Sequence, residues 1–382
     1  MPGWRVNVSR LNKLRTCIFI CTSVALTGCS QGLPVQLPTL GPSALQRAQQ
    51  LYLAGQYAEA EAQADKAIKE GKEYGLSSAM LADILSAQGK YQEAEVAARE
   101  GVRYEPRVAN THAALSRALL GLGSFRDAEE EARLSLQQPE ATATPTSRAS
   151  QHTLVALALQ MQGKVPEAEK EYRAAIAEDK NFGPAYAAYG GLLAIMARYG
   201  EAEPLLEQAV RLMPKDAGAL IAYVSTLTSE GKLADAAAAN EKLAALAPKD
   251  PNVPVMQSDI YLKQGKVAEA AAEASNAVKM SGNYGPAHRA LAAAYLKEGR
   301  LKEAEAEAVK AAQLTPIDPY AQLLLAQVFF EEKKWMASGI ALTAAAQLAP
   351  FNKPLQGEVR SMGAKIWANV PHPPMKPPKA RH

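Results

Sequence analysis

The sequence predicts an all-α solenoid of about nine helix–turn–helix repeats, and three observations carry this prediction. A short phrase, Gly-x-apolar-x-acid-Ala, recurs along the chain, and its copies start 34 residues apart, with a single step of 40. Aromatic residues make up only 6% of the chain and alanine is abundant, which suits thin helices that approach closely. No run of alternating β-branched residues indicates a strand. A fixed period of this length is typical of repeat architectures.

The phrase is best developed at Gly89-Lys-Tyr91-Gln-Glu93-Ala94. Its glycine is expected to end the first helix of a repeat, where the chain turns sharply with positive φ. Its acid then lies in the first turn of the second helix, facing the positive end of the helix dipole. These residue types are therefore interpreted as structural. The other copies start at Gly55, Gly123, Gly163, Ala197, Gly231, Gly265 and Gly299, with a degenerate last copy at Lys333.

Further positions follow the same period. With the alanine of the phrase at place 20 of a 34-residue unit, places 8 and 27 hold small residues in most repeats, and place 32 is proline in five. Proline there stops the second helix. This pattern resembles the tetratricopeptide repeat over residues 41–352, and the resemblance implies a right-handed superhelix. The repeats then start at Gly41, Gly75, Ala109, Ala149, Gly183, Ala217, Pro251, Gly285 and Pro319.

Two segments depart from the period. Six additional residues lie within 138–147, where Pro, Thr and Ser predict a loop that lengthens one turn. Residues 353–370 carry apolar side chains at helical spacing, which predicts a helix that caps the last repeat. Residues 371–382 form a Pro-rich basic tail, expected to be extended. The tail either keeps the chain soluble or contacts an anionic glycan or lipid.

The N-terminus predicts export and lipid anchoring. Residues 1–28 combine a basic start with a short apolar core, as signal peptides do. Leu26-Thr-Gly-Cys29 resembles the lipobox of bacterial lipoproteins, which implies lipidation of Cys29 and cleavage before it. The alternatives are a secretory signal that happens to hold a cysteine, or a plain membrane anchor. Residues 29–40 are expected to be an extended tether. Ser30 after the cysteine favours the outer membrane by analogy.

Charge and residue types argue against several functions. The formal charge is +3, but residues 1–28 contribute +4 and the tail +3, so the repeat body carries about −4. That balance does not indicate a nucleic-acid-binding protein. All three cysteines lie at or before Cys29. His112, His152 and His288 share place 4 in separate repeats, which favours packing over a metal site. No catalytic, cofactor-binding or metal-binding motif is present, so we expect a protein that is not an enzyme.

The expected binding site is the inner face of the array. In tetratricopeptide arrays the first helices line this face, and the resemblance assigns the partner-binding role by place in the repeat. The family's Lys-and-Asn clamp for a terminal carboxylate is not reproduced. Three basic residues in the later repeats predict a patch that favours anions, with simple solvation of an exposed face as the alternative. The candidate groove residues are Met80, Asp83, Arg117, Asp259, Lys263, Arg289, Lys297, Gln327 and Phe330.

The sequence therefore predicts a scaffold that binds polypeptide partners of a bacterial envelope assembly. It would face the periplasm from a membrane to which its lipid anchors it, without a nucleic-acid partner. Among lipid-anchored repeat proteins it is similar to pilus-assembly and secretin-pilotin lipoproteins. The alternative is a glycan-binding or accessory subunit of a complex that makes or exports polysaccharide or peptidoglycan.

Overall fold

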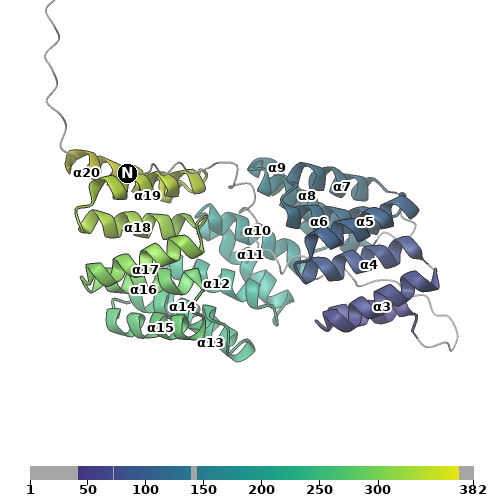
Figure 1. The fold of residues 1–382 in the computed structure, drawn as a ribbon, viewed down its shortest axis with the longest axis horizontal. Helices are drawn as coiled ribbons and strands as arrows, with labels where there is room; N and C mark the ends of the chain where they lie inside the picture. Colours follow the sequence, from purple (N-terminus) through teal and green to yellow (C-terminus); the bar gives the residue numbers. More distant parts are fainter. Residues whose placement is uncertain (1–41, 72, 139–143, 370–382) are drawn as a thin grey trace, which may run out of the picture. The chain divides into compact units, whose positions relative to one another are not determined.

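A computed structural model describes residues 42–71, 73–138 and 144–369 (Figure 1). Within these residues the chain is helical throughout, without strands, and forms nine successive helix pairs followed by one last helix. The all-α repeat architecture predicted from the sequence is confirmed. The signal segment, Cys29, the tether and the basic tail lie outside the described residues.

Each repeat consists of a first and a second helix, and in the first four and the last three repeats the two helices pack against each other. The first helices are α2 (Ala44–Leu53), α4 (Tyr74–Ala87), α6 (Ala109–Leu122), α8 (Pro145–Met161), α10 (Gly183–Ile195), α12 (Ala217–Glu230), α14 (Asn252–Lys263), α16 (Gly285–Lys297) and α18 (Pro319–Glu331). The second helices are α3 (Tyr57–Glu70), α5 (Tyr91–Tyr104), α7 (Phe125–Gln137), α9 (Val165–Glu178), α11 (Tyr199–Leu212), α13 (Leu233–Leu246), α15 (Val267–Met280), α17 (Leu301–Leu314) and α19 (Trp335–Leu348). The final helix is α20 (Lys353–Asn369).

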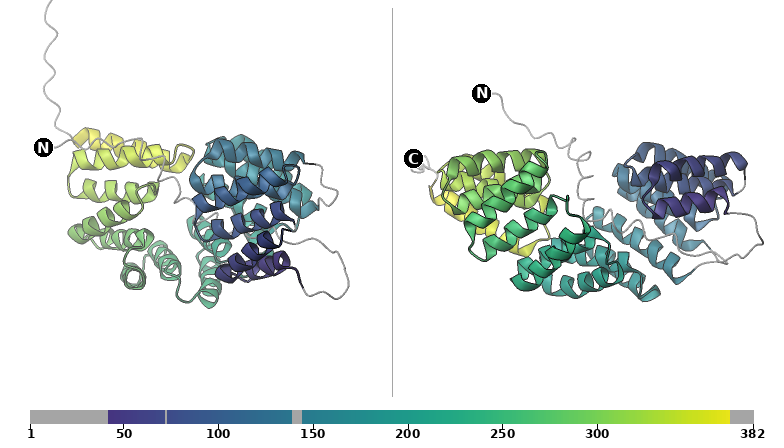
Figure 2. Two further views of the ribbon diagram at one scale, coloured as in Figure 1. Left: turned by 45° about the vertical axis from the view of Figure 1, so that its right-hand side comes forward. Right: turned by 90° about the horizontal axis from the view of Figure 1, so that it is seen from below.

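The repeats form two compact units. The N-terminal unit comprises the chain up to Ala194 together with Gly200–Tyr223, and the C-terminal unit comprises Ile195–Tyr199 and the chain from Val224 onward. The division therefore falls inside α12. Within each unit, consecutive helices lie side by side in antiparallel pairs (Figure 2).

Small residues sit where helices cross. Alanine at place 20 is completely buried in the first eight repeats, as Ala94 and Ala304 illustrate, and Ser338 takes its place in the ninth. The small residue at place 8 is also completely buried, as Ala48 and Ala82 illustrate. With only a methyl group at each crossing, the two backbones approach closely and their neighbours interlock around them.

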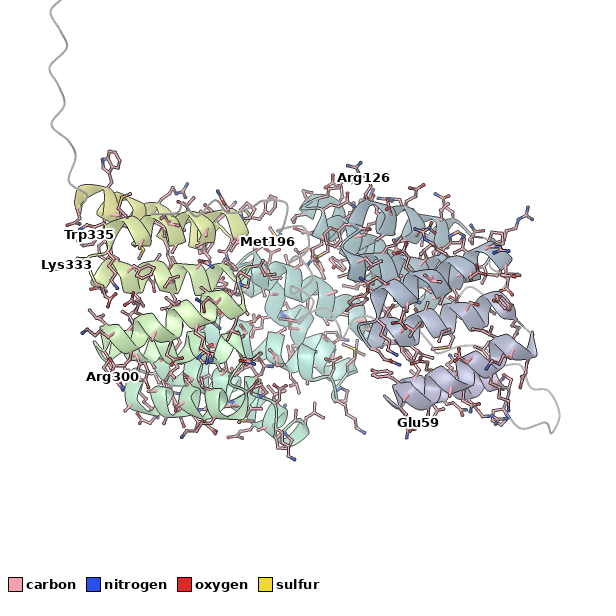
Figure 3. The ribbon with its side chains drawn as sticks, viewed as in Figure 1. Glu59, Arg126, Met196, Arg300, Lys333 and Trp335 are labelled. Carbon is pink, nitrogen blue, oxygen red and sulfur yellow. The ribbon has the colours of Figure 1, made fainter. Side chains whose placement is uncertain are left out.

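The turns between the paired helices use the left-handed conformation. Gly89 and the corresponding glycines of six other repeats have φ between 74° and 81°, as expected from the phrase. Ala197 and Lys333 occupy the same turn with φ of 57° and 61°. A side chain in this region costs about 1–3 kcal/mol. The repeat geometry therefore imposes this conformation even where glycine is missing. Figure 3 shows Lys333 just ahead of Trp335, which starts α19.

The turn is reinforced on the outer side by ion pairs between successive repeats. A glutamate at place 21 of one second helix accepts from the lysine that precedes the next second helix. The Nζ–Oε distances are 3.2 Å for Lys90–Glu61 and 3.0 Å for Lys164–Glu129. The hydrogen bond from Gln88 and the nearby Lys90 lower the pKa of Glu61, so this carboxyl stays charged at neutral pH.

The predicted loop at 138–147 is shorter than expected, because its C-terminal residues belong to a helix. α8 starts at Pro145 and is 17 residues long, so part of the insertion extends a first helix. Thr144 and Ser147 form a reciprocal capping box, in which each side chain accepts from the other's backbone N–H. Proline at the first helical position loses no hydrogen bond. Residues 145–147, whose composition predicts a loop, therefore form the start of a helix.

The last helix covers the end of the C-terminal unit. Leu355 and Ile366 of α20 are buried in a cluster with Leu342 and Ala345 of α19. Val359 and Met362 pack against the same cluster. α20 thus shields the apolar face that a tenth repeat would otherwise cover.

A larger side chain at a helix crossing should destabilise the fold. Ala304 is completely buried among Ala292, Leu324 and Val328, so Ala304→Leu should reduce the free energy of unfolding by about 1–3 kcal/mol. Ala306, on the same helix, is exposed, and Ala306→Leu should change it by less than about 0.5 kcal/mol. Thermal melts followed by circular dichroism compare the two variants. Equal melts would contradict the assigned crossing.

Candidate functional site

The first helices line the inner side of each unit. α4 contacts α6 in the N-terminal unit, and α14 contacts α16, which contacts α18, in the C-terminal unit. Consecutive second helices make no comparable contacts in the part of the chain that the structure describes. Helices that lie closer together occupy the inside of a curve, so the first helices form the inner face of each unit.

The inner face of the N-terminal unit carries an ion pair between two neighbouring first helices. Arg117 of α6 donates from Nε and Nη2 to the two carboxylate oxygens of Asp83 on α4, at 2.7 and 2.6 Å. Arg117 is buried. Such a bidentate pair has strong geometry. These two predicted groove residues therefore pair with each other and link two successive repeats.

The inner face of the C-terminal unit holds a looser charge cluster. Arg289 of α16 lies between Asp318, with Nε and Oδ2 3.5 Å apart, and Asp259 of α14, with Nη2 and Oδ2 3.9 Å apart. The Nε of Arg289 has no hydrogen-bond partner. All three side chains are about one-quarter exposed. The guanidinium is thus attracted by two carboxylates, but neither carboxylate accepts a hydrogen bond from its Nε.

The charges in this cluster influence one another. Burial disfavours the charged form of Arg289, but Asp259 and Asp318 outweigh it and raise the arginine's pKa, so Arg289 stays protonated. Burial raises the pKa of Asp259, although Arg289 and Lys263 oppose the shift. Lys263 and Lys297, at the ends of α14 and α16, are exposed. The structure therefore groups three of the predicted basic residues on two neighbouring first helices.

The side chains of the remaining predicted groove residues are partly buried against their neighbours. Met80 packs against the first core cluster, beside Tyr52 and Ile84. Phe330 packs against the last cluster, with its ring centroid 5.1 Å from that of Trp335. Gln327 is half-buried. These side chains offer only part of their surface to a ligand.

Sequence reasoning missed a repeated histidine–glutamate pair. In three repeats the histidine at place 4 of the first helix meets a glutamate 19 residues later on the second helix. His112 Nδ1 lies 2.7 Å from Glu131, and its Nε2 lies 2.9 Å from the carbonyl oxygen of Pro106. Both neighbours are acceptors, which favours the doubly protonated ring. The shared 19-residue spacing was the available signal. The pairs are His112–Glu131, His152–Glu171 and His288–Glu307.

The histidines lie in separate repeats, as predicted. No group of three or more metal-ligating side chains occurs among residues 42–71, 73–138 and 144–369. Each ring is held by a single carboxylate within its own repeat. The arrangement joins the two helices of a repeat.

Comparison with known families identifies the repeat. A tetratricopeptide repeat model matches residues 193–254 and 261–328, and a second such model matches 42–66. The chain carries tetratricopeptide repeats. The nine helix pairs continue this pattern through the segments between the matches. Tetratricopeptide arrays are typically non-catalytic scaffolds for interactions between proteins.

Several solved structures are similar to this chain at low sequence identity. A tetratricopeptide repeat protein from Parabacteroides merdae is 18% identical, with a TM-score of 0.46, over 66% of this chain and 97% of that one. A thermophilic protein of Thermus thermophilus is 22% identical, with a TM-score of 0.41, over 46% and 95%. Yeast Tom70 is 13% identical, with a TM-score of 0.40, over 84% and 95%. No curated protein sequence matches the chain.

The His112–Glu131 pair makes stability depend on pH. The hydrogen bond to Glu131 raises the pKa of His112, while burial opposes it and the Pro106 carbonyl supports it. A raised folded-state pKa stabilises the fold below the ordinary value of 6.5 and loses this effect as pH rises through the folded-state pKa. His112→Gln should therefore lower the melting midpoint most at pH 5.5–6 and least at pH 8.5–9. Melts across this range measure the difference.

The control removes the carboxylate instead. Glu131→Gln leaves His112 without its charged acceptor, so in that background His112→Gln should show little dependence on pH. A difference between parent and His112→Gln that grows with pH would contradict the assigned protonation.

Proposed function

We propose that this protein is a membrane-anchored tetratricopeptide scaffold that binds polypeptide partners of a bacterial envelope assembly. Its binding face is formed by the first helices of the C-terminal unit, α14, α16 and α18. The proposal joins an inner-face charge cluster, which the structure describes, to an N-terminal lipobox, which it does not.

The incomplete pairing of Arg289 carries the choice of binding face. Asp259 and Asp318 lie 3.9 and 3.5 Å away, and its Nε has no hydrogen-bond partner. The Nε itself is buried, but a guanidinium has five N–H donors and suits a planar carboxylate, so the exposed quarter of the Arg289 side chain offers further donors to an acidic group of a ligand. Lys263 and Lys297 extend the positive charge toward the helix ends. The Asp83–Arg117 pair of the other unit is already satisfied.

The anchoring part of the proposal rests on the sequence. Leu26-Thr-Gly-Cys29 follows a basic start and a short apolar core. Among the helices of the described residues, none is long and apolar enough to cross a bilayer. Two or more acyl chains hold a protein on a membrane stably, where a single chain binds only marginally. A lipid on Cys29, together with the repeats, fits a scaffold of the envelope, with pilus assembly or secretion as its setting.

The anchor is tested by removing the thiol. Cys29→Ser cannot be lipidated, so the variant should leave the detergent phase and appear in the aqueous phase of a phase-partitioning experiment. Cys21→Ser, in the segment predicted to be cleaved, is the matched control and should partition like the parent. Detergent-phase recovery of both variants would overturn the lipoprotein assignment.

The binding face is tested by charge exchange. Lys263→Glu, Arg289→Gln and Lys297→Glu together should reduce partner recovery from solubilised membranes by at least about tenfold, because charge-assisted contacts are lost. The quantity measured is one partner identified by mass spectrometry in pull-downs with the parent. Far-UV circular dichroism confirms that the helices remain.

The matched control makes the same change in net charge on second helices. Lys279→Glu, Lys310→Gln and Lys302→Glu lie on α15 and α17 and are exposed. This variant should retain the partner. Equal recovery by both variants would exclude the inner face, and equal loss would assign the effect to overall charge. Retention of the parent on isolated peptidoglycan or polysaccharide, without a protein partner, would favour the glycan-binding alternative.

A further inference from the structure

The outer face of the last repeat differs from that of every other repeat. α19 has no charged residue from Trp335 to Leu348, whereas each of the other second helices has at least three. Met336 and Ile340 are 73% and 71% exposed. Because they are four residues apart, they project from the same side of the helix. A Cβ added at Gly339, between them, would meet nothing within 4 Å.

The exposed apolar side chains concentrate at this end of the chain. Met336, Ile340 and Trp367 are the three most exposed large hydrophobic residues of the described chain, and Phe351 is 49% exposed. α19 and α20 contact each other and lie together at one end of the C-terminal unit (Figure 1). Single exposed apolar residues are ordinary, but a group on adjacent helices indicates a contact surface.

The same segment is basic in an otherwise acidic repeat body. Residues 333–369 hold five basic residues and one acid, a net charge of +4, while residues 42–332 carry −8. Lys353, Arg360 and Lys365 are exposed on α20. Lys334 is engaged by Glu305 and Glu332, so the α20 residues provide most of the available positive charge.

We propose that the α19–α20 surface, defined by Met336, Ile340, Lys353, Arg360 and Lys365, contacts an anionic lipid membrane. Exposed apolar side chains on α19 and exposed basic residues on the adjacent α20 match the two requirements of peripheral membrane binding, which are insertion into the interface and attraction to anionic headgroups. The surface goes beyond the protein-binding face and does not depend on the lipid anchor.

A second copy of the chain fits this surface less well. Symmetric pairing would bring a segment of charge +4 against an identical segment, and like charges oppose each other. Since Met336 and Ile340 are more than two-thirds exposed, they protrude rather than line a groove. Protruding side chains suit a deformable lipid surface.

Vesicle co-sedimentation tests the proposal with the full chain carrying Cys29→Ser, so that no acyl chain contributes. The chain should bind phosphatidylcholine vesicles that contain about 30% phosphatidylglycerol more tightly than pure phosphatidylcholine vesicles, and salt should weaken the difference. Met336→Ser with Ile340→Ser should reduce binding to the anionic vesicles by about tenfold. Val96→Ser, at a residue that is 66% exposed on α5, is the control and should have no effect.

Neutralising charge provides a second variant. Lys353→Gln with Lys365→Gln should weaken binding to the anionic vesicles and leave the weaker binding to pure phosphatidylcholine unchanged. Lys279→Gln with Lys310→Gln, on second helices outside the surface, should have little effect. All variants share the same N-terminus, so differences among them report only the substituted positions.

A contact measurement covers the case in which the N-terminal segment dominates sedimentation. A photoreactive benzophenone side chain at position 340 should crosslink to lipid in anionic vesicles, and the same group at position 96 should not. Crosslinking to lipid at both positions or at neither would overturn the proposal. Crosslinking from position 340 to a second copy would assign the surface to self-association instead.

Discussion

The structure depends on the close approach of two helices at a single small residue in each repeat. Alanine at place 20 is completely buried in eight repeats, and Ser338 replaces it in the ninth, donating its hydroxyl to the carbonyl oxygen of Ala326. Because the crossing leaves room for no more than a methyl or hydroxymethyl group, it sets the distance between helices, and this distance recurs every 34 residues. The inner face, the outer ion pairs and the end that α20 covers all follow from repeating this contact.

The same geometry is strong enough to override local preference. Ala197 and Lys333 adopt the left-handed turn that glycine adopts in seven other repeats, although a side chain there is unfavourable. Thr144 and Pro145 start a helix in a stretch whose composition is typical of a loop. In the first case packing outweighs a cost confined to one residue in each turn, and in the second a capping box and a proline at the first helical position favour the helix start.

Polar contacts add specificity to a framework that is mainly apolar and small. Within a repeat, His112 joins Glu131, and between repeats Arg117 joins Asp83 across 34 residues. The inner faces of the two units differ for this reason. Asp83 satisfies Arg117 with two short hydrogen bonds, whereas Arg289 lies at 3.5 Å or more from both of its carboxylates. The same repeat architecture therefore holds a fully paired arginine in one unit and a partly paired arginine in the other.

The sequence by itself determined the helical repeats, their period, the residues at the crossings and the turns, because these depend on contacts that recur at fixed spacing. It also placed Lys263, Arg289 and Lys297 on first helices. Only the tertiary structure decided which charges pair. Those pairs join residues that are 19 to 35 positions apart, and they depend on the rotation and spacing of neighbouring helices. The exposed face of α19 was visible as a run without charge, but only packing showed that Met336 and Ile340 point outward while Leu342 and Ala345 are covered by α20.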